Sequence, residues 1–204
     1  MTKSFKIILF IIFLLQSQFC SAQEDGAAAC AAAKIHYFGQ LSQNPRARIA
    51  YPGDATIDVN YYKIKLSLNY VATSIVSETT IKLKAKSNIN ECTLDLSSVL
   101  TTDSVKLNNQ KAKYLHSNNK LTLSFAQTLK TGEEISIIVF YHGIPSASTG
   151  SFVFGTLNSK ISNVIYSLSE PYGASDWFPC KDNPADKADS SDVWITAPSY
   201  FVSV

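Results

Sequence analysis

The sequence has few residues of the kinds that hold metal ions. Its three histidines, His36, His116 and His142, lie far apart, and its four cysteines form no Cys-x-x-Cys pair. Zinc sites in proteins usually draw their His and Cys ligands from closely spaced pairs. We therefore predict no metal site and no bound cofactor in this chain.

The chain also has few charged residues. Charged residues make up 17% of the 204 residues, and the formal net charge is only +2, with the basic residues scattered. Such a charge balance does not indicate binding to nucleic acid or to an acidic membrane surface. With 46% hydrophobic residues, the chain can bury one good core but is too short for two large domains.

The chain has no apolar run long enough to anchor it in a bilayer, which takes about 20 residues. The run IILFIIFLL (7–15) is much shorter and follows Lys3 and Lys6. Cys20 and Ala22 then provide small residues at positions −3 and −1 of a cleavage site before Gln23. This pattern predicts a secretory signal peptide at 1–22, no stable membrane anchor, and a periplasmic, cell-surface or secreted protein.

The segment after the leader differs from the rest of the chain. Its sequence DGAAACAAAKIHYFGQL (25–41) is rich in helix formers and has an acidic start, which predicts one short helix. Asn44-Pro45 and the turn residues near 51–54 follow. We expect a helical lead-in and linker at 23–50 and one domain at 51–204.

From there on, apolar residues alternate with polar ones. Tyr62, Ile64 and Leu66 alternate with Lys63 and Lys65, as half-buried strands require. The same period appears in IKLKAK (81–86), CTLDL (92–96), KLTLSF (120–125) and EISIIVFYH (134–142), with turn residues between. We predict an all-β fold, an antiparallel β-sandwich or saddle-shaped sheet with a short N-terminal helix.

The lysines that alternate along these strands have two interpretations. They could form a binding face, but we favour a role in keeping the sheet soluble and its edges unpaired.

Removal of the leader would leave Cys30, Cys92 and Cys180, an odd number that cannot all pair within the chain. Cys92 alternates with Leu94 and Leu96, which suggests a buried thiol. A bridge between Cys30 and Cys180 is left open, because spacing alone cannot support it.

The segment SEPYGASDWFPCKDNPADKADSSDVWITAP (169–198) resembles the end of the amino-terminal domain of the aminopeptidase N family of zinc metallopeptidases. The shared pattern is an acidic residue before proline, an aromatic-Phe-Pro-Cys run, a following Asp and Pro, and a strand ending in Thr-x-Pro. DVNYYKIKLSLN (58–69), TLDLSSVLTTDSVKLNN (93–109) and LKTGEEISIIVFYHGIP (129–145) are similar to the family's earlier strands. The resemblance extends from residue 58 to the end, and the signal peptide and helical lead-in look like the exported bacterial branch.

The resemblance implies a β saddle that covers the active site of a downstream, thermolysin-like domain. That domain holds the zinc, a Gly-x-Met-Glu-Asn motif and a His-Glu-x-x-His motif. This chain has neither motif, and its only methionine is Met1. We expect no peptide hydrolysis by the chain alone, and we interpret its last strand, which stops at Val204, as cut before the catalytic domain.

One functional residue is implied by the resemblance. Glu170 stands where the family's glutamate binds the free α-amino group of the peptide substrate, and a carboxylate suits an ammonium group. Pro171 and Gly173 would form the turn that aims it. Leu168 replaces a glutamine common in the family, which predicts a more apolar rim to the pocket.

The rest of this segment is interpreted as structural. Trp177, Phe178 and Pro179 are expected to wedge the loop into the core, and Cys180 is expected to be buried rather than reactive. Asp182 and Asp186 could cap turns. A calcium site built from Asp176, Asp182, Asp186 and Asp189 was considered, but the spacing matches no known calcium loop. The alternative function is a free-standing exported β-sandwich that binds peptides or glycans.

Overall fold

The computed structural model describes residues 53–157, 162–169 and 172–202 of the chain. The expected signal peptide (1–22) and the helical lead-in and linker (23–50) lie outside the described residues, so they stay predictions. Within the described ranges, no helix has the length and apolar character needed to cross a membrane.

The described residues form β-strands and two short 3-10 helices, which confirms the all-β prediction. In chain order, the elements are β1 Ile57–Asn69, β2 Ser74–Ala85, β3 Ile89–Asp95, β4 Leu100–Leu107, β5 Gln110–Lys111, β6 Lys113–Ser117, β7 Lys120–Leu129, β8 Glu134–Gly143, η2 Ala147–Thr149, β9 Phe152–Leu157, β10 Ser162–Ser167, η3 Ala174–Asp176 and β11 Ser190–Thr196.

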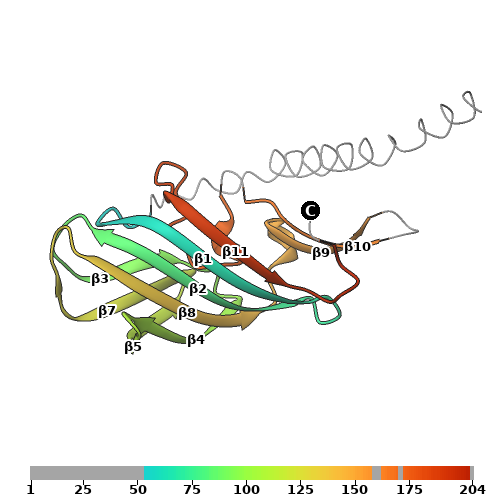
Figure 1. Cartoon of the computed structure of the whole chain (residues 1–204), viewed down its shortest axis with the longest axis horizontal. Coiled ribbons are helices and arrows are strands. Elements are labelled where there is room, and N and C mark those ends of the chain that lie inside the picture. The colour runs from blue at the N-terminus through green and yellow to red at the C-terminus, as the bar shows by residue number, and fades with distance from the viewer. Residues whose placement is uncertain (1–52, 158–161, 170–171, 203–204) are drawn as a thin grey trace, which may run out of the picture. The chain divides into compact units, whose positions relative to one another are not determined.

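These strands make three sheets (Figure 1). The largest has the order β11-β1-β2-β8-β4-β5, a second has the order β3-β7-β6, and β9 and β10 form a hairpin of their own. One buried apolar cluster contains side chains from the largest sheet and from the β3-β7-β6 sheet. The two sheets therefore share one core, as the predicted sandwich requires.

One pairing differs from the antiparallel prediction, because β11 runs parallel to β1. A parallel neighbour cannot be reached through a tight hairpin and needs a long crossover connection. β1 and β11 are joined through all the intervening strands, and the last segment of that path, between β10 and β11, contains the residues singled out in the sequence.

The predicted alternation is present in the strands. In β2, Ile81, Leu83 and Ala85 are buried, whereas Lys82 and Lys84 are exposed. The sheet thus has one face on the core and one face in water.

In β1 the alternation changes phase at a bulge. The pairing with β2 shifts register between Val59 and Tyr61. Ile57 and Val59 are buried before the shift, and Ile64 and Leu66 are buried after it. The extra residue at the bulge moves the buried positions from odd to even numbers.

Two of the predicted turns are two-residue hairpin loops. Asn108 and Asn109 join β4 to β5, and Asn118 and Asn119 join β6 to β7; all four have positive φ, from 47° to 68°. Asparagine tolerates this left-handed backbone better than most residues, and such turns match the twist of paired strands.

Candidate functional site

The connection between β10 and β11 begins with the residues expected to meet a substrate. β10 ends at Ser167, three residues before Glu170. Leu168 follows, is half-buried, and donates its N–H to the Ser151 carbonyl oxygen at 2.9 Å. Glu170 and Pro171 lie outside the described residues, so their predicted roles are untested.

The residue just before Glu170 is held by a buried tryptophan. The indole Nε1 of Trp177 donates a hydrogen bond to Ser169 Oγ at 2.9 Å. Trp177 is itself fixed, because its carbonyl oxygen accepts a hydrogen bond of 2.9 Å from the buried Tyr141 hydroxyl. Two hydrogen bonds therefore connect Ser169, through Trp177, to the buried Tyr141.

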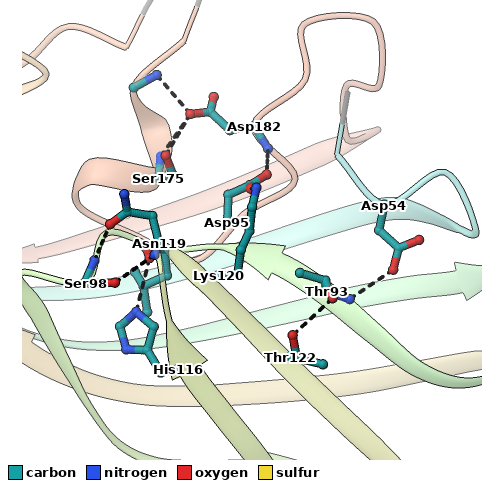
Figure 2. Close-up of polar contacts among 12 residues, drawn as sticks. Asp54, Thr93, Asp95, Ser98, His116, Asn119, Lys120, Thr122, Ser175 and Asp182 are labelled. Atoms are coloured by element: carbon teal, nitrogen blue, oxygen red, sulfur yellow. Dashed lines mark hydrogen bonds and ion pairs between the residues drawn. The ribbon is translucent and has the colours of Figure 1, made fainter. Parts of the chain in front are cut away.

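The turn on the other side of the Glu170–Pro171 pair is held by a carboxylate. Asp182 Oδ2 accepts hydrogen bonds from the Gly173 N–H at 3.0 Å and from the Ser175 hydroxyl at 2.9 Å (Figure 2). Gly173 is buried and has a φ of 116°, a conformation that disfavours any residue with a side chain. The prediction that Asp182 caps a turn is confirmed.

A second aspartate, which was not predicted from the sequence, fixes Asp182. Asp95, at the end of β3, is buried; its Oδ2 accepts the Asp182 N–H at 3.0 Å, and its Oδ1 pairs with Lys120 (Figure 2). Its backbone also exchanges two hydrogen bonds with Cys180, at 2.7 and 3.0 Å. The only signal was an acidic residue inside the apolar strand CTLDL, where alternation placed it on the wet side.

The aromatic residues of the loop pack as expected. Trp177 belongs to the buried core, and its ring lies 5.3 Å from Phe152 and 4.6 Å from Phe178 between centroids. Phe178 packs edge-on against Tyr62 at 5.6 Å, and Pro179 is buried. The prediction that this run wedges the loop into the core is confirmed.

A buried lysine holds the next part of the loop. Lys181 Nζ donates a hydrogen bond to the Ile57 carbonyl oxygen at 2.8 Å and pairs with the Asp186 carboxylate. The backbone N–H of Lys181 donates a hydrogen bond to Tyr62 Oη at 3.0 Å. Burial raises the pKa of Tyr62 well above its usual value. The hydroxyl therefore stays protonated, so the contact is between neutral groups.

Comparison with known proteins identifies the fold. Residues 58–204 match the family model described as the Peptidase M1 N-terminal domain. The chain belongs to this family. The resemblance found in the sequence is thereby confirmed.

Solved structures of M1 enzymes share the fold. The M1 zinc metallopeptidase from Deinococcus radiodurans is 25% identical with a TM-score of 0.63, covering 74% of this chain and 35% of that chain. A mutant from the same organism is 26% identical with a TM-score of 0.61, covering 72% and 33%. Another, described as bound to a Tyr-Ser-Ala substrate, is 23% identical with a TM-score of 0.60, covering 72% and 34%, and shows the fold alone.

The chain therefore spans about a third of the length of these M1 structures. No curated protein sequence matches the chain.

The M1 family is one of zinc enzymes, but the described residues do not fit a zinc centre. Across these ranges, no three His, Cys, Asp or Glu side chains converge as a metal site would require. His116 contacts Thr102 and the Leu96 carbonyl oxygen, whereas His142 contacts Asp103. Both imidazoles thus take part in separate local contacts.

Three of the four aspartates named for a calcium site have separate roles. Asp182 accepts loop hydrogen bonds, Asp186 pairs with Lys181, and Asp189 contacts Asn60 at 3.4 Å. Their carboxylates do not form a common cluster with Asp176.

Two of the cysteines of this M1 domain can be located. Cys92 and Cys180 are buried, as predicted for each, and they are not bridged to one another. Burial raises the pKa of both thiols, to about 12 for Cys92, so neither is a ready nucleophile. Cys30 lies outside the described residues, so its possible bridge to Cys180 stays an open prediction.

Proposed function

We propose that this chain supplies the amino-terminal, substrate-capping domain of an exported zinc aminopeptidase, which removes N-terminal residues from peptides. The observation that carries this proposal is the anchored loop around residue 170 in a domain of the M1 family. Ser169 and Gly173, the described residues on either side of 170–171, are each held by a hydrogen bond, Ser169 to Trp177 and Gly173 to Asp182.

Glu170 is the residue to which we assign substrate contact. A carboxylate placed there can accept charge-assisted hydrogen bonds from the free α-ammonium group of a peptide. Internal peptide bonds and acetylated N-termini lack that positive charge, so the contact would select free N-termini. Leu168, which is half-buried at the start of the same loop, would give the pocket a more apolar rim.

The partner we propose is a thermolysin-like catalytic domain, which would hold the zinc and perform the chemistry. Support comes from apolar surface around β11. Val193 and Ile195 point to the same side of the sheet as the buried Ile64 and Leu66, yet they are 50% and 52% exposed. With Phe201, they line a groove of about 370 Å³, an apolar surface of the kind that marks interaction sites.

We also propose that the protein is exported and that residues 1–204 alone do not cleave peptides. The support for export is the leader-like sequence at 1–22, and the support for inactivity is the lack of a His-Glu-x-x-His motif in the sequence.

The test uses the enzyme in which this domain stands beside its catalytic domain. Replacing Glu170 with Ala should lower kcat/KM for peptides with a free N-terminus by about 10- to 1000-fold, because a charged hydrogen-bond partner of the substrate is lost. The measurement is the initial rate of release of the N-terminal residue at several peptide concentrations.

Asp189→Ala is the matched control, since it removes an exposed carboxylate from the same connection. We expect it to leave kcat/KM within about twofold of the wild type. Full activity in the Glu170→Ala enzyme would show that Glu170 has no role in substrate binding.

A further inference from the structure

The face of the largest sheet that points away from the core carries a row of aromatic and charged side chains. Trp194 of β11 pairs in register with Lys65 of β1, Lys65 pairs with Glu78 of β2, and Glu78 pairs with Phe140 of β8. Paired residues point to the same face of a sheet. The row therefore crosses four strands side by side (Figure 1).

A hollow of about 300 Å³ lies along this row. Its lining includes Trp194, Phe140, Val76, Lys65 and Glu78. Trp194 and Val76 are 57% and 60% exposed, and the Lys65–Glu78 ion pair, at 2.7 Å, has side chains 41% and 31% exposed. Two aromatic rings thus stand beside a hydrated donor and acceptor, the mixture typical of small-ligand sites.

The tryptophan is oriented by a neighbouring lysine. Lys63 Nζ lies 4.0 Å from the Trp194 ring centroid. Lys63 pairs across the strands with Asp192, which lies two residues before Trp194 in β11. The hollow instead includes Thr196, two residues after Trp194. Lys63 thus contacts Trp194 without lining the hollow, and Trp194 itself lines it.

Three further lysines lie over aromatic rings on this face, and the Asp192 carboxylate lies opposite one of them, Lys63. Lys82 and Lys106 lie over the rings of Tyr61 and Phe140, each at 5.2 Å from the centroid, as Lys63 does over Trp194. An aromatic ring does not neutralise the cation above it, whereas the charge of Lys65 is offset by the Glu78 carboxylate. This face thus combines exposed rings with ammonium groups.

We propose that this hollow binds an acidic polysaccharide. The C–H face of one sugar ring would pack on Trp194, and its hydroxyl groups would bind Lys65 and Glu78 as donor and acceptor. Carboxylate or sulfate groups on neighbouring sugars would pair with Lys63 and Lys106. A polysaccharide offers free sugar hydroxyl groups to the Glu78 acceptor at the hollow, whereas the sugars of duplex DNA are esterified to phosphate along the chain.

The first experiment uses the purified chain and polygalacturonate in affinity gel electrophoresis. We expect the polymer to retard the wild type, and Trp194→Ala to weaken binding by about tenfold, because a stacked ring is lost. Tyr200→Ala is the matched control, as Tyr200 is a similarly exposed aromatic, 64%, outside the hollow. No retardation, or equal losses in both variants, would overturn the proposal.

Intrinsic fluorescence gives a readout that needs no variant. The chain has two tryptophans, and Trp177 is only 9% exposed, so acrylamide quenching reports mainly on Trp194. Polygalacturonate should protect Trp194 from acrylamide, whereas neutral dextran should not. Unchanged quenching with polygalacturonate would rule out contact at the hollow, and equal protection by dextran would rule out the requirement for acidic groups.

The role of the lysines is tested by removing their charge. The double variant Lys63→Gln/Lys106→Gln should weaken polygalacturonate binding at least fivefold at low salt and reduce its salt dependence. The double variant Lys113→Gln/Lys130→Gln makes the same change in net charge away from this face and should bind within about twofold of the wild type. Equal effects of both, or tighter binding of duplex DNA than of polygalacturonate, would contradict the proposal.

Discussion

Asp182 shows how one carboxylate can shape a functional loop. Its Oδ2 accepts hydrogen bonds from Gly173 and Ser175, while its own N–H is bound by Asp95. These donors belong to a turn whose glycine is buried, so an unmade hydrogen bond there has a free-energy cost. The position of the turn next to residue 170 therefore depends on Asp182.

Replacing Asp182 with Ala should lower the free energy of unfolding by about 1–3 kcal/mol, because the amide of Gly173 and the hydroxyl of Ser175 lose their acceptor. Urea unfolding measures the loss, and hydrogen exchange should show faster exchange at the Gly173 amide. In Asp189→Ala the change should stay within about 0.5 kcal/mol. Unchanged exchange at Gly173 in the Asp182→Ala variant would contradict this role.

At this scale the sequence predicted part of the site. Asp182 was recognisable as a turn-capping residue and Trp177 as a core anchor, because each residue type has a local preference. Asp95 was not recognisable, because its burial results from a loop that lies 85 residues or more further along the chain. A strand residue that alternation assigns to the wet face is buried when another segment covers it.

The elements of the fold depend on short turns with special backbone conformations. Asn109, in the β4–β5 loop, has a φ of 68° and is exposed. This conformation has a free-energy cost of about 1–2 kcal/mol for most residues with a Cβ. The cost is smaller for asparagine and absent for glycine.

Asn109→Ala should therefore lower the free energy of unfolding by about 1 kcal/mol, and Asn109→Gly should leave it equal or slightly higher. Thermal or urea denaturation of the pair measures the difference. Equal stability of the alanine and glycine variants would mean that the backbone of this turn does not constrain the residue.

The phase of β1 illustrates the limit of periodicity. The alternation through Tyr62, Ile64 and Leu66 predicted the buried face of the strand after the bulge. Ile57 and Val59 are also buried, although they have the opposite parity. The bulge between Val59 and Tyr61 forms against β2, so the alternation within β1 alone does not reveal it.

The whole domain buries several groups that could ionise. Burial raises the pKa of the thiols of Cys92 and Cys180 and of the hydroxyls of Tyr62 and Tyr141. The unfolded chain loses these protons at lower pH than the folded domain does. Stability should therefore be full below about pH 9 and should fall as the pH rises above it.

Cys92 gives a quantitative test, since its pKa rises from 9.0 to about 12 on folding. Between pH 8 and pH 10.5, the wild type should lose roughly 2 kcal/mol more unfolding free energy than Cys92→Ala, because only its unfolded state ionises this thiol. Urea unfolding of both proteins at the two pH values measures this difference. Parallel pH profiles would show that the Cys92 thiol ionises equally in both states.

The sequence by itself determined the all-β class, most of the strands, their turns and the family resemblance. These features depend on alternation, on residues suited to positive φ and on a contiguous motif, all of which are local in the chain. Only the tertiary structure decided that β11 lies parallel to β1, that Asp95 is buried beneath the loop, and that Trp194 and Phe140 share one hollow. Each of these depends on which distant segments pack together, because pairing and burial are properties of contacts and not of single residues.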